Sequence, residues 1–218
     1  MPAIVWDAIG ERYYETGVDH GVLYTPDASG VYSSGVAWNG LTSVSESPSG
    51  AEANAQYADN IKYLNLISAE EFGATIEAFT YPPEFAPFDG LAVPSEGVVV
   101  GQQPRKAFGL SYRTRVGNDL EGDQYGYKLH LVYGCQASPS EKAYNTINDS
   151  PEAITFSWEI TTTPAPVTGY SPTSLLVIDS TLVDPAALTS LEALLYGDTL
   201  GAKLPTPDEV IALFPVVP

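Results

Sequence analysis

The chain has 218 residues, 44% of them hydrophobic, and it carries 27 Asp and Glu against nine Lys and Arg, a formal net charge of −18. This length favours one domain with a sizeable core, and no apolar run approaches the ~20 residues that a transmembrane helix needs. The acidic excess argues against binding of nucleic-acid phosphates, which depends mainly on cationic contacts, and the N-terminus has no basic head or long apolar stretch that would indicate a secretory signal.

The first part of the chain predicts an arm followed by two strands. The arm covers residues 2–16 and includes a short strand candidate at Ala3–Trp6. Strands are predicted at Gly17–Tyr24 and Val36–Glu46, because Pro and Gly residues mark the turns between them.

A long loop is predicted at residues 47–73, and it is the most informative segment of the chain. It holds roughly two dozen residues of mixed polarity without a clean period, and an excursion of that size inside a compact domain is usually functional or disordered. Its apolar side chains argue against disorder, so we expect the loop to bury them against a partner. These side chains are Tyr57, Ile61, Tyr63, Leu64, Leu66, Ile67 and Phe72.

The middle of the chain predicts a half-buried strand and a second loop. Residues Ala74–Tyr81 alternate as one face of a sheet requires, and the two prolines that follow end the pairing because they cannot donate to a ladder. Residues 82–97 form a loop rich in Pro and Gly that also carries Phe85 and Phe88.

The clearest hairpin follows this loop. Lys106–Val116 and Gln124–Gln136 are two long strand candidates joined by an acidic turn. Two more strands are predicted at Glu152–Thr163 and Ser174–Ile178. The order of elements therefore predicts a mainly β protein of the sandwich or barrel type, with one domain over residues 1–218.

The C-terminal segment, about residues 184–214, predicts two short helices. Asp184 is a suitable N-cap with Pro185 at the first helical position, and Gly197 ends this helix. Thr206 caps the second, which opens with another proline.

The sequence offers little that resembles a catalytic or metal site. His20, His130 and Cys135 are too far apart for zinc-ligand spacing, and there is no nucleophile elbow or phosphate loop. The acidic turn at 118–123 fails as a calcium loop, because Leu120 stands where an oxygen ligand is needed. Convergence of two carboxylates in the folded chain stays open, but we expect no enzyme, no catalytic residue, no metal and no cofactor.

Basic residues gather around the central hairpin. Arg113 and Arg115 fall on one face of its first strand. A row of Arg in an acidic protein indicates pairing with carboxylates, either within the chain or on a neighbouring copy, where the planar guanidinium favours bidentate contacts.

Three long sequence segments resemble the major tail proteins, or tail tube proteins, of long, non-contractile-tailed bacteriophages (siphophages). The segments occupy residues 47–85, 101–134 and 140–164. The resemblance extends in order over most of residues 1–214.

This resemblance implies a β-sandwich or β-barrel-like tail-tube fold with one flanking helix and a short C-terminal helix. It implies a structural virion protein, made in the host bacterial cytoplasm, whose hexameric rings stack into the hollow tube that delivers phage DNA. The implied partners are further copies of the chain, the tail-tip initiator, the tape-measure and tail-terminator proteins, and DNA that passes without specific binding; no membrane is implied. The alternative is a virion decoration or receptor- or carbohydrate-binding β-domain that stacks exposed Tyr, Trp38, Phe85 and Phe88 on sugars.

By the same resemblance, the 47–73 loop reaches an adjacent subunit or ring, with the N-terminal arm and the 82–97 loop as weaker interface candidates. Glu77 and Glu159, each on an otherwise neutral strand face, are expected to line the lumen, where repulsion keeps DNA from sticking. The candidate interface residues are Tyr57, Asp59, Ile61, Tyr63, Leu64, Leu66, Phe72, Phe85, Phe88, Arg113 and Arg115.

Overall fold

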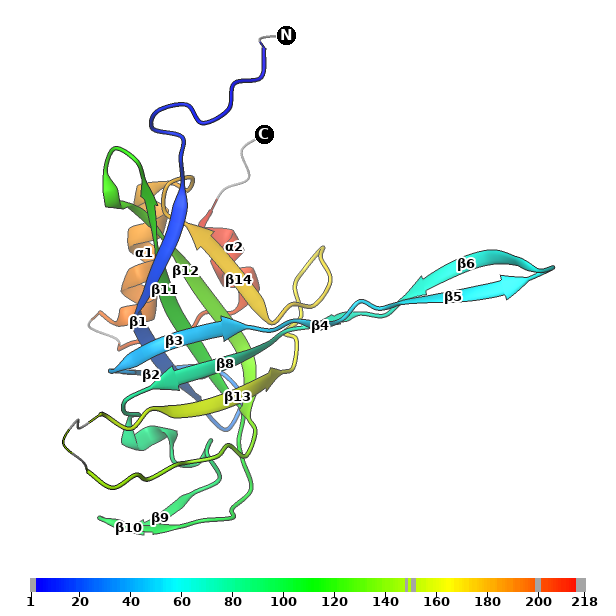
Figure 1. Cartoon of the computed structure of the whole chain (residues 1–218). Helices are drawn as coiled ribbons and strands as arrows, with labels where there is room; N and C mark the ends of the chain where they lie inside the picture. Colours follow the sequence, from blue (N-terminus) through cyan, green and yellow to red (C-terminus); the bar gives the residue numbers. More distant parts are fainter. Residues whose placement is uncertain (1–2, 148, 150–151, 199–200, 215–218) are drawn as a thin grey trace.

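The computed structural model describes residues 3–147, 149, 152–198 and 201–214 (Figure 1). Residue 2 of the expected arm and residues 199–200 of the expected C-terminal segment lie outside the described residues. The elements are β1 (Tyr14–Pro26), β2 (Tyr32–Ala37), β3 (Leu41–Glu46), β4 (Ser49–Gly50), β5 (Ala53–Ala58), β6 (Ile61–Ile67), β7 (Glu70–Glu71), β8 (Gly73–Ala78), a 3-10 turn (Pro83–Phe85), β9 (Ala92–Ser95), β10 (Val98–Val100), β11 (Phe108–Asn118), β12 (Gly122–Ala137), β13 (Phe156–Thr162), β14 (Leu175–Asp179), α1 (Pro185–Tyr196) and α2 (Pro207–Leu213).

An eight-stranded antiparallel sheet forms the body. Its strand order is β2-β1-β11-β12-β13-β8-β3. The eighth strand, β14, lies off this path and pairs with a different part of β12 than β13 does. In Figure 1 the strands β1, β11, β12 and β14 run upright, while β3, β8 and β13 cross in front of them. The mainly β, sandwich-like architecture is therefore confirmed.

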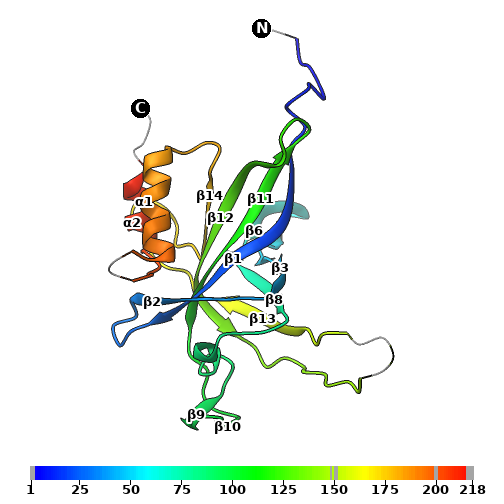
Figure 2. The same cartoon turned by 90° about the vertical axis from the view of Figure 1, so that its left-hand side faces the viewer.

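Two hydrophobic cores lie on opposite faces of the upright strands. The first fills the space between them and the crossing strands, and it includes Leu110, Ile76 and Trp158. The second is covered by α1 and α2 and includes Leu131 and Leu191 (Figure 2). Strands β11 and β12 are therefore buried on both faces, as three layers require.

A bend at Gly134 allows β12 to take part in both halves of the sheet. Residues 128–132 of β12 pair with β14, whereas Cys135–Ala137 pair with β13. Gly134 has a φ of 61°, and a Cβ there would lie 2.2 Å from the carbonyl oxygen of Thr163. Only glycine fits this close approach of two backbones.

Both predicted helices are confirmed with their caps. The Asp184 carboxylate accepts a hydrogen bond from the backbone N–H of Ala187 at 2.9 Å, and Gly197 ends α1 with a φ of 97°. At α2, Thr206 and Glu209 form a reciprocal capping box. The apolar face of α1 supplies Leu188, Leu191 and Leu195 to the second core.

The expected N-terminal strands differ from the observed ones in two places. The segment Val36–Glu46 is two strands, because the chain turns at Trp38–Gly40, where Gly40 has a φ of 76°. The segment Ala3–Trp6 is not a strand, since it leaves the body and pairs with no other described strand.

The second loop at 82–97 is folded rather than open. Its 3-10 turn places Phe85 and Phe88 in the first core with exposed fractions of 0% and 3%. The Phe85 ring lies 4.7 Å from Trp38 and 5.4 Å from Phe108 between centroids. Phe85 and Phe88 are therefore not interface or sugar-stacking residues, and both expectations are wrong; the loop buries its aromatic groups in its own chain.

Replacing Phe85 with alanine tests this core role. We expect the free energy of unfolding to fall by about 3–5 kcal/mol, because the substitution leaves a cavity among aromatic rings. Phe79→Ala is the matched control: Phe79 is half exposed, so its loss should cost less than about 1 kcal/mol. Chemical denaturation followed by fluorescence measures both, and equal costs would contradict the assignment of Phe85 to the core.

Candidate assembly surfaces

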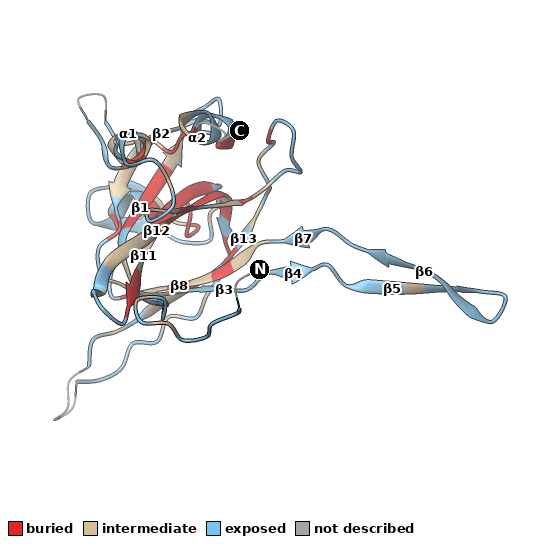
Figure 3. Ribbon diagram, turned by 90° about the horizontal axis from the view of Figure 1, so that it is seen from above, coloured by how far each residue is buried: buried red, intermediate tan, exposed pale blue. Residues whose placement is uncertain are grey.

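Residues 49–71 form a two-stranded β-ribbon that projects far from the body (Figures 1 and 3). The β4–β7 pair forms its root and the β5–β6 pair its outer part. At the tip, Asp59 and Asn60 have φ values of 50° and 63° between the paired residues Ala58 and Ile61. Two residues with positive φ make a turn whose twist suits a hairpin. The expectation of an irregular loop is wrong, and the Asp-Asn pair is the turn signal in the sequence that predicts this hairpin.

Both faces of the ribbon are apolar. Cross-strand partners share a face, so Leu64 and Leu66, opposite Gln56 and Asn54, lie on one side. The register shifts between Gln56 and Tyr57, which puts Ile61, opposite Ala58, on this same side. Tyr57 and Ile67 lie on the other side. The large apolar side chains have exposed fractions from 39% for Leu64 to 72% for Tyr57. The predicted residues Tyr57, Asp59, Ile61, Tyr63, Leu64 and Leu66 thus lie together on the outer ribbon and touch no core of the described chain.

The outer ribbon is electrically neutral, in contrast to the rest of the chain. Residues 53–67 contain one acid, Asp59, and one base, Lys62, within a protein of net charge −18. A neutral apolar element can approach another copy of an acidic protein without the repulsion that separates the bodies.

A polar cluster of the buried Tyr112 and His130 with the exposed Glu46 connects the end of β3, just before the ribbon, to the body. The Tyr112 hydroxyl donates to Glu46 Oε1 at 2.6 Å, and His130 Nδ1 lies 3.2 Å from the same oxygen. The His130 ring stacks on Tyr112 with centroids 4.6 Å apart, and its Nε2 lies 3.0 Å from Thr114 Oγ1. Burial lowers the pKa of His130 below its ordinary value, and the charge of Glu46 opposes this shift.

Glu77 and Glu159 lie on the same outer face, that of β3, β8 and β13. Glu77 pairs across the strands with Ser157, and Glu159 pairs with Thr75. The Ser43 hydroxyl donates to Glu77 Oε2 at 2.9 Å. These three strands contain no Lys or Arg, so the face is acidic and hydroxyl-rich. Its position toward a lumen remains a prediction.

Arg113 and Arg115 make their ion pairs within the chain. Arg113 binds Asp19 through two hydrogen bonds, Nε to Oδ1 at 2.6 Å and Nη2 to Oδ2 at 3.0 Å. Arg115 contacts Asp19 and Asp123. Partial burial alone would raise the pKa of Asp19, but the hydrogen bonds from Arg113 and His20 outweigh it and lower the pKa to about 2. The intramolecular alternative accounts for these contacts, and a role at a subunit interface remains a prediction.

The remaining candidates are distributed as follows. Phe72, at the base of the ribbon, is half-buried against the first core. The β9–β10 hairpin projects from the foot of the body with Val93, Val98 and Val99 exposed (Figure 2). The N-terminal arm, a weaker interface candidate from the sequence, exposes Trp6 and its apolar neighbours.

The described part of the chain was searched for groups of metal-ligand side chains and for helices that could span a bilayer. Within residues 3–147, 149, 152–198 and 201–214, no three His, Cys, Asp or Glu side chains gather as metal ligands would. In the same ranges, no helix has the length and apolar character needed to cross a bilayer.

Comparison with known proteins gives a structural likeness but no family. No family model matches the chain, and no curated protein matches it. A solved structure described as the baseplate of the anti-feeding prophage, determined by cryo-electron microscopy with six-fold symmetry, aligns with 82% of this chain and all of its own chain at 10% identity and a TM-score of 0.33. A TM-score of 0.33 lies below that of a shared fold, so this likeness carries no argument about the function of the chain.

The Asp19 pair yields a prediction for acid stability. A carboxylate whose pKa falls from 3.8 in the unfolded chain to about 2 in the folded one stabilises the fold above pH 4. We expect Asp19→Asn to cost about 1–2 kcal/mol at pH 7. This difference from wild type should shrink as the pH falls from 4 to 2, because Asp19 takes up its proton in the unfolded chain first.

Urea denaturation of both proteins across this pH range measures the difference. Glu84→Gln, at an exposed acid, is the control and should differ little from wild type at any pH. A constant gap between Asp19→Asn and wild type down to pH 2 would contradict the ion-pair account.

Proposed function

We propose that this protein is the subunit of a phage tail tube. In this proposal, hexameric rings of the chain stack into a hollow tube in the virion, and DNA passes through the tube without specific binding. The observation that carries the proposal is the neutral ribbon that projects from an acidic body and exposes apolar side chains on both of its faces. The resemblance of three long sequence segments to major tail proteins also supports a tail tube protein.

The ribbon needs a partner on physical grounds. An isolated two-stranded hairpin is marginally stable in water, and only a covered face or further strands make it secure. The outer ribbon exposes apolar side chains on both faces, and large exposed patches of this kind mark interaction sites. Its outer strand edges also present backbone groups for pairing. A second copy of the same chain, equally neutral at this element, is the partner that meets these requirements.

Other features fit a conduit. The outer face of β3, β8 and β13 joins acids with hydroxyl groups and lacks Lys and Arg, which suits a wall past which DNA slides, because few cationic contacts hold phosphates. The tail-tip initiator, tape-measure and tail-terminator proteins would be its partners at the two ends and inside the tube. The role is structural and needs no turnover.

The alternative of a sugar-binding virion domain loses part of its basis. Trp38, Phe85 and Phe88 were its proposed stacking platform, and all three are buried in the first core. Exposed tyrosines alone do not favour this class over self-assembly.

Removing the outer ribbon tests the proposal. Residues 53–67 would be replaced by Asn-Gly, which joins Glu52 to Ser68 where the Ser68 N–H already donates to the Glu52 oxygen at 3.4 Å. We expect the shortened monomer to keep its stability within about 1 kcal/mol, because the removed residues contact no core. Negative-stain electron microscopy at high protein concentration should show hollow tubes or rings for the wild type and none for the shortened chain.

Two outcomes would contradict the proposal. If the shortened protein forms the same tubes, the ribbon is not an assembly element. If the concentrated wild type forms neither rings nor tubes and binds a glycan array instead, the alternative class replaces the tail-tube proposal.

Pairs of substitutions test whether both ribbon faces are used. Leu64→Thr with Leu66→Thr removes apolar groups from one face, and Tyr57→Thr with Ile67→Thr removes them from the other, while threonine keeps a high strand propensity. We expect each pair to raise the protein concentration needed for assembly at least about tenfold. Asn65→Thr is the control and should leave it unchanged. Sedimentation measures the assembled fraction, and a pair without effect would show that its face is not covered.

A further inference from the structure

The N-terminal arm is a second unpartnered apolar element. Ile4, Val5, Trp6 and Ile9 have exposed fractions of 72–76%. Residues 3–9 carry a single charge, Asp7. In Figures 1 and 2 this arm leaves the top of the body and extends beyond the β11–β12 turn.

The direction of the arm is set at its base. The Gly10 N–H donates to Asp119 Oδ1 at 2.9 Å, and Asn118 Nδ2 donates to the Gly10 oxygen at 3.4 Å. Arg12 donates through Nε and Nη2 to the backbone carbonyl oxygen of Asp7 at 3.2 and 3.0 Å. The Gly10 contacts hold the arm's base on the β11–β12 turn, and a change of the arm's direction at Asp7 would have to break the Arg12 contacts.

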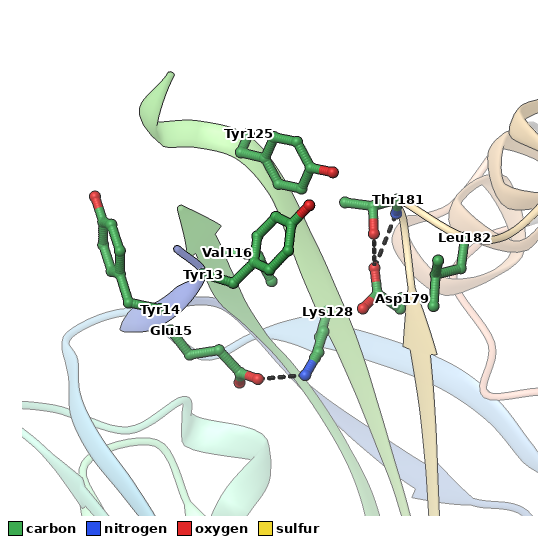
Figure 4. Close-up of a pocket in the computed structure, with 9 residues that line it drawn as sticks. All are labelled: Tyr13, Tyr14, Glu15, Val116, Tyr125, Lys128, Asp179, Thr181 and Leu182. Atoms are coloured by element: carbon green, nitrogen blue, oxygen red, sulfur yellow. Dashed lines mark hydrogen bonds and ion pairs between the residues drawn. The ribbon is translucent and has the colours of Figure 1, made fainter. Parts of the chain in front are cut away.

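A pocket of about 580 Å³ opens at the same end of the molecule, between β1, β12 and the end of β14 (Figure 4). Tyr13 and Tyr125, with ring centroids 5.3 Å apart, form one wall. Leu182, which is 83% exposed, lies at the opposite side. The volume is that of a site for a group of small-ligand size.

The polar groups in this pocket are already paired with each other. Lys128 Nζ binds Glu15 Oε1, and Asp179 Oδ1 accepts from both the N–H and the hydroxyl of Thr181. A sugar or an anion would have to compete for these partners, whereas an apolar aromatic group needs only the Tyr and Leu walls. An aromatic ring in contact with tyrosines, edge-on or offset-stacked, adds favourable free energy beyond that of the apolar area it buries.

We propose that the arm of one copy docks in this pocket of a second copy, with Trp6 between the tyrosine wall and Leu182. The inference rests on the proposed function, because it assigns a contact within that assembly. The arm and the pocket lie at the same end of the molecule, so the contact suits copies placed side by side around an axis rather than stacked end to end. A contact between two different surfaces of identical copies closes into a ring when the rotation permits.

Tryptophan fluorescence gives a direct test. Of the three tryptophans, all within the described residues, Trp6 is 76% exposed, whereas Trp38 and Trp158 are buried at 3% and 0%. Acrylamide quenching therefore reports on Trp6, and Trp6→Phe identifies its share of the emission. Full-length protein is measured over a concentration series with light scattering on the same samples.

We expect Trp6 to be quenched in dilute protein and to lose this quenching as particles larger than the monomer form. Leu182→Arg should keep Trp6 quenchable at concentrations where Val31→Arg, a matched change at an exposed valine away from the pocket, assembles with Trp6 protected. Rings with protected Trp6 but no tubes would support this contact while contradicting the stacking of rings.

Three outcomes would overturn the inference. Assemblies in which Trp6 stays fully quenchable would overturn the arm contact and leave the proposed function standing. Protection already present in dilute monomer would assign the pocket to the arm of the same chain. A wild type that stays monomeric over the whole series, with Trp6 quenchable throughout, would overturn both this contact and the self-assembly on which it rests.

Discussion

The architecture depends on one constraint, the shared use of the long strand β12 by two differently oriented halves of the sheet. On one edge β12 pairs with β11 from Gly122 to Cys135; on the other edge residues 128–132 pair with β14 and residues 135–137 pair with β13. The change of direction occurs at Gly134, where a side chain would collide with the Thr163 backbone. Because β12 turns there, the crossing strands close over one face of β11 and β12 and leave the other face to the helices. Both cores, and the position of the ribbon at the end of β3, follow from this turn.

Much of the body could be predicted from sequence because its signals are local. The caps of α1 and α2 depend on Asp184 and Thr206, residues whose side chains bond within three positions of themselves. Strand β8 alternates because only one of its faces is buried. Along β11 and β12 apolar residues occupy both faces, and Leu110 and Leu131 lie in opposite cores.

The ribbon and the 82–97 loop could not be predicted in the same way. Alternation arises when one face meets water and the other meets a core, but β6 carries Leu66 and Ile67 on opposite faces, both in water, and a register shift interrupts its pairing. Its pattern therefore has no period of two, although it is a regular strand. Phe85 failed for a different reason: its burial depends on Trp38, Phe108 and Trp158, which are distant in sequence. No local pattern distinguishes an aromatic residue that fills such a space from one that awaits a partner.

The charge distribution links these features to self-association. A net charge of −18 keeps the bodies of two copies apart, so any contact that overcomes this repulsion has to come from elements that carry little charge. The outer ribbon and the end of the arm are two such elements: the ribbon's single acid is matched by Lys62, and residues 3–9 of the arm carry only Asp7. Both extend beyond the acidic body (Figures 1 and 3). Apolar contact at their length places the charged surfaces farther apart than direct contact of the bodies would, and screening over about 8–10 Å then weakens the remaining repulsion. Projection and neutrality thus act together, because a short apolar patch on the same body would bring the carboxylates into contact.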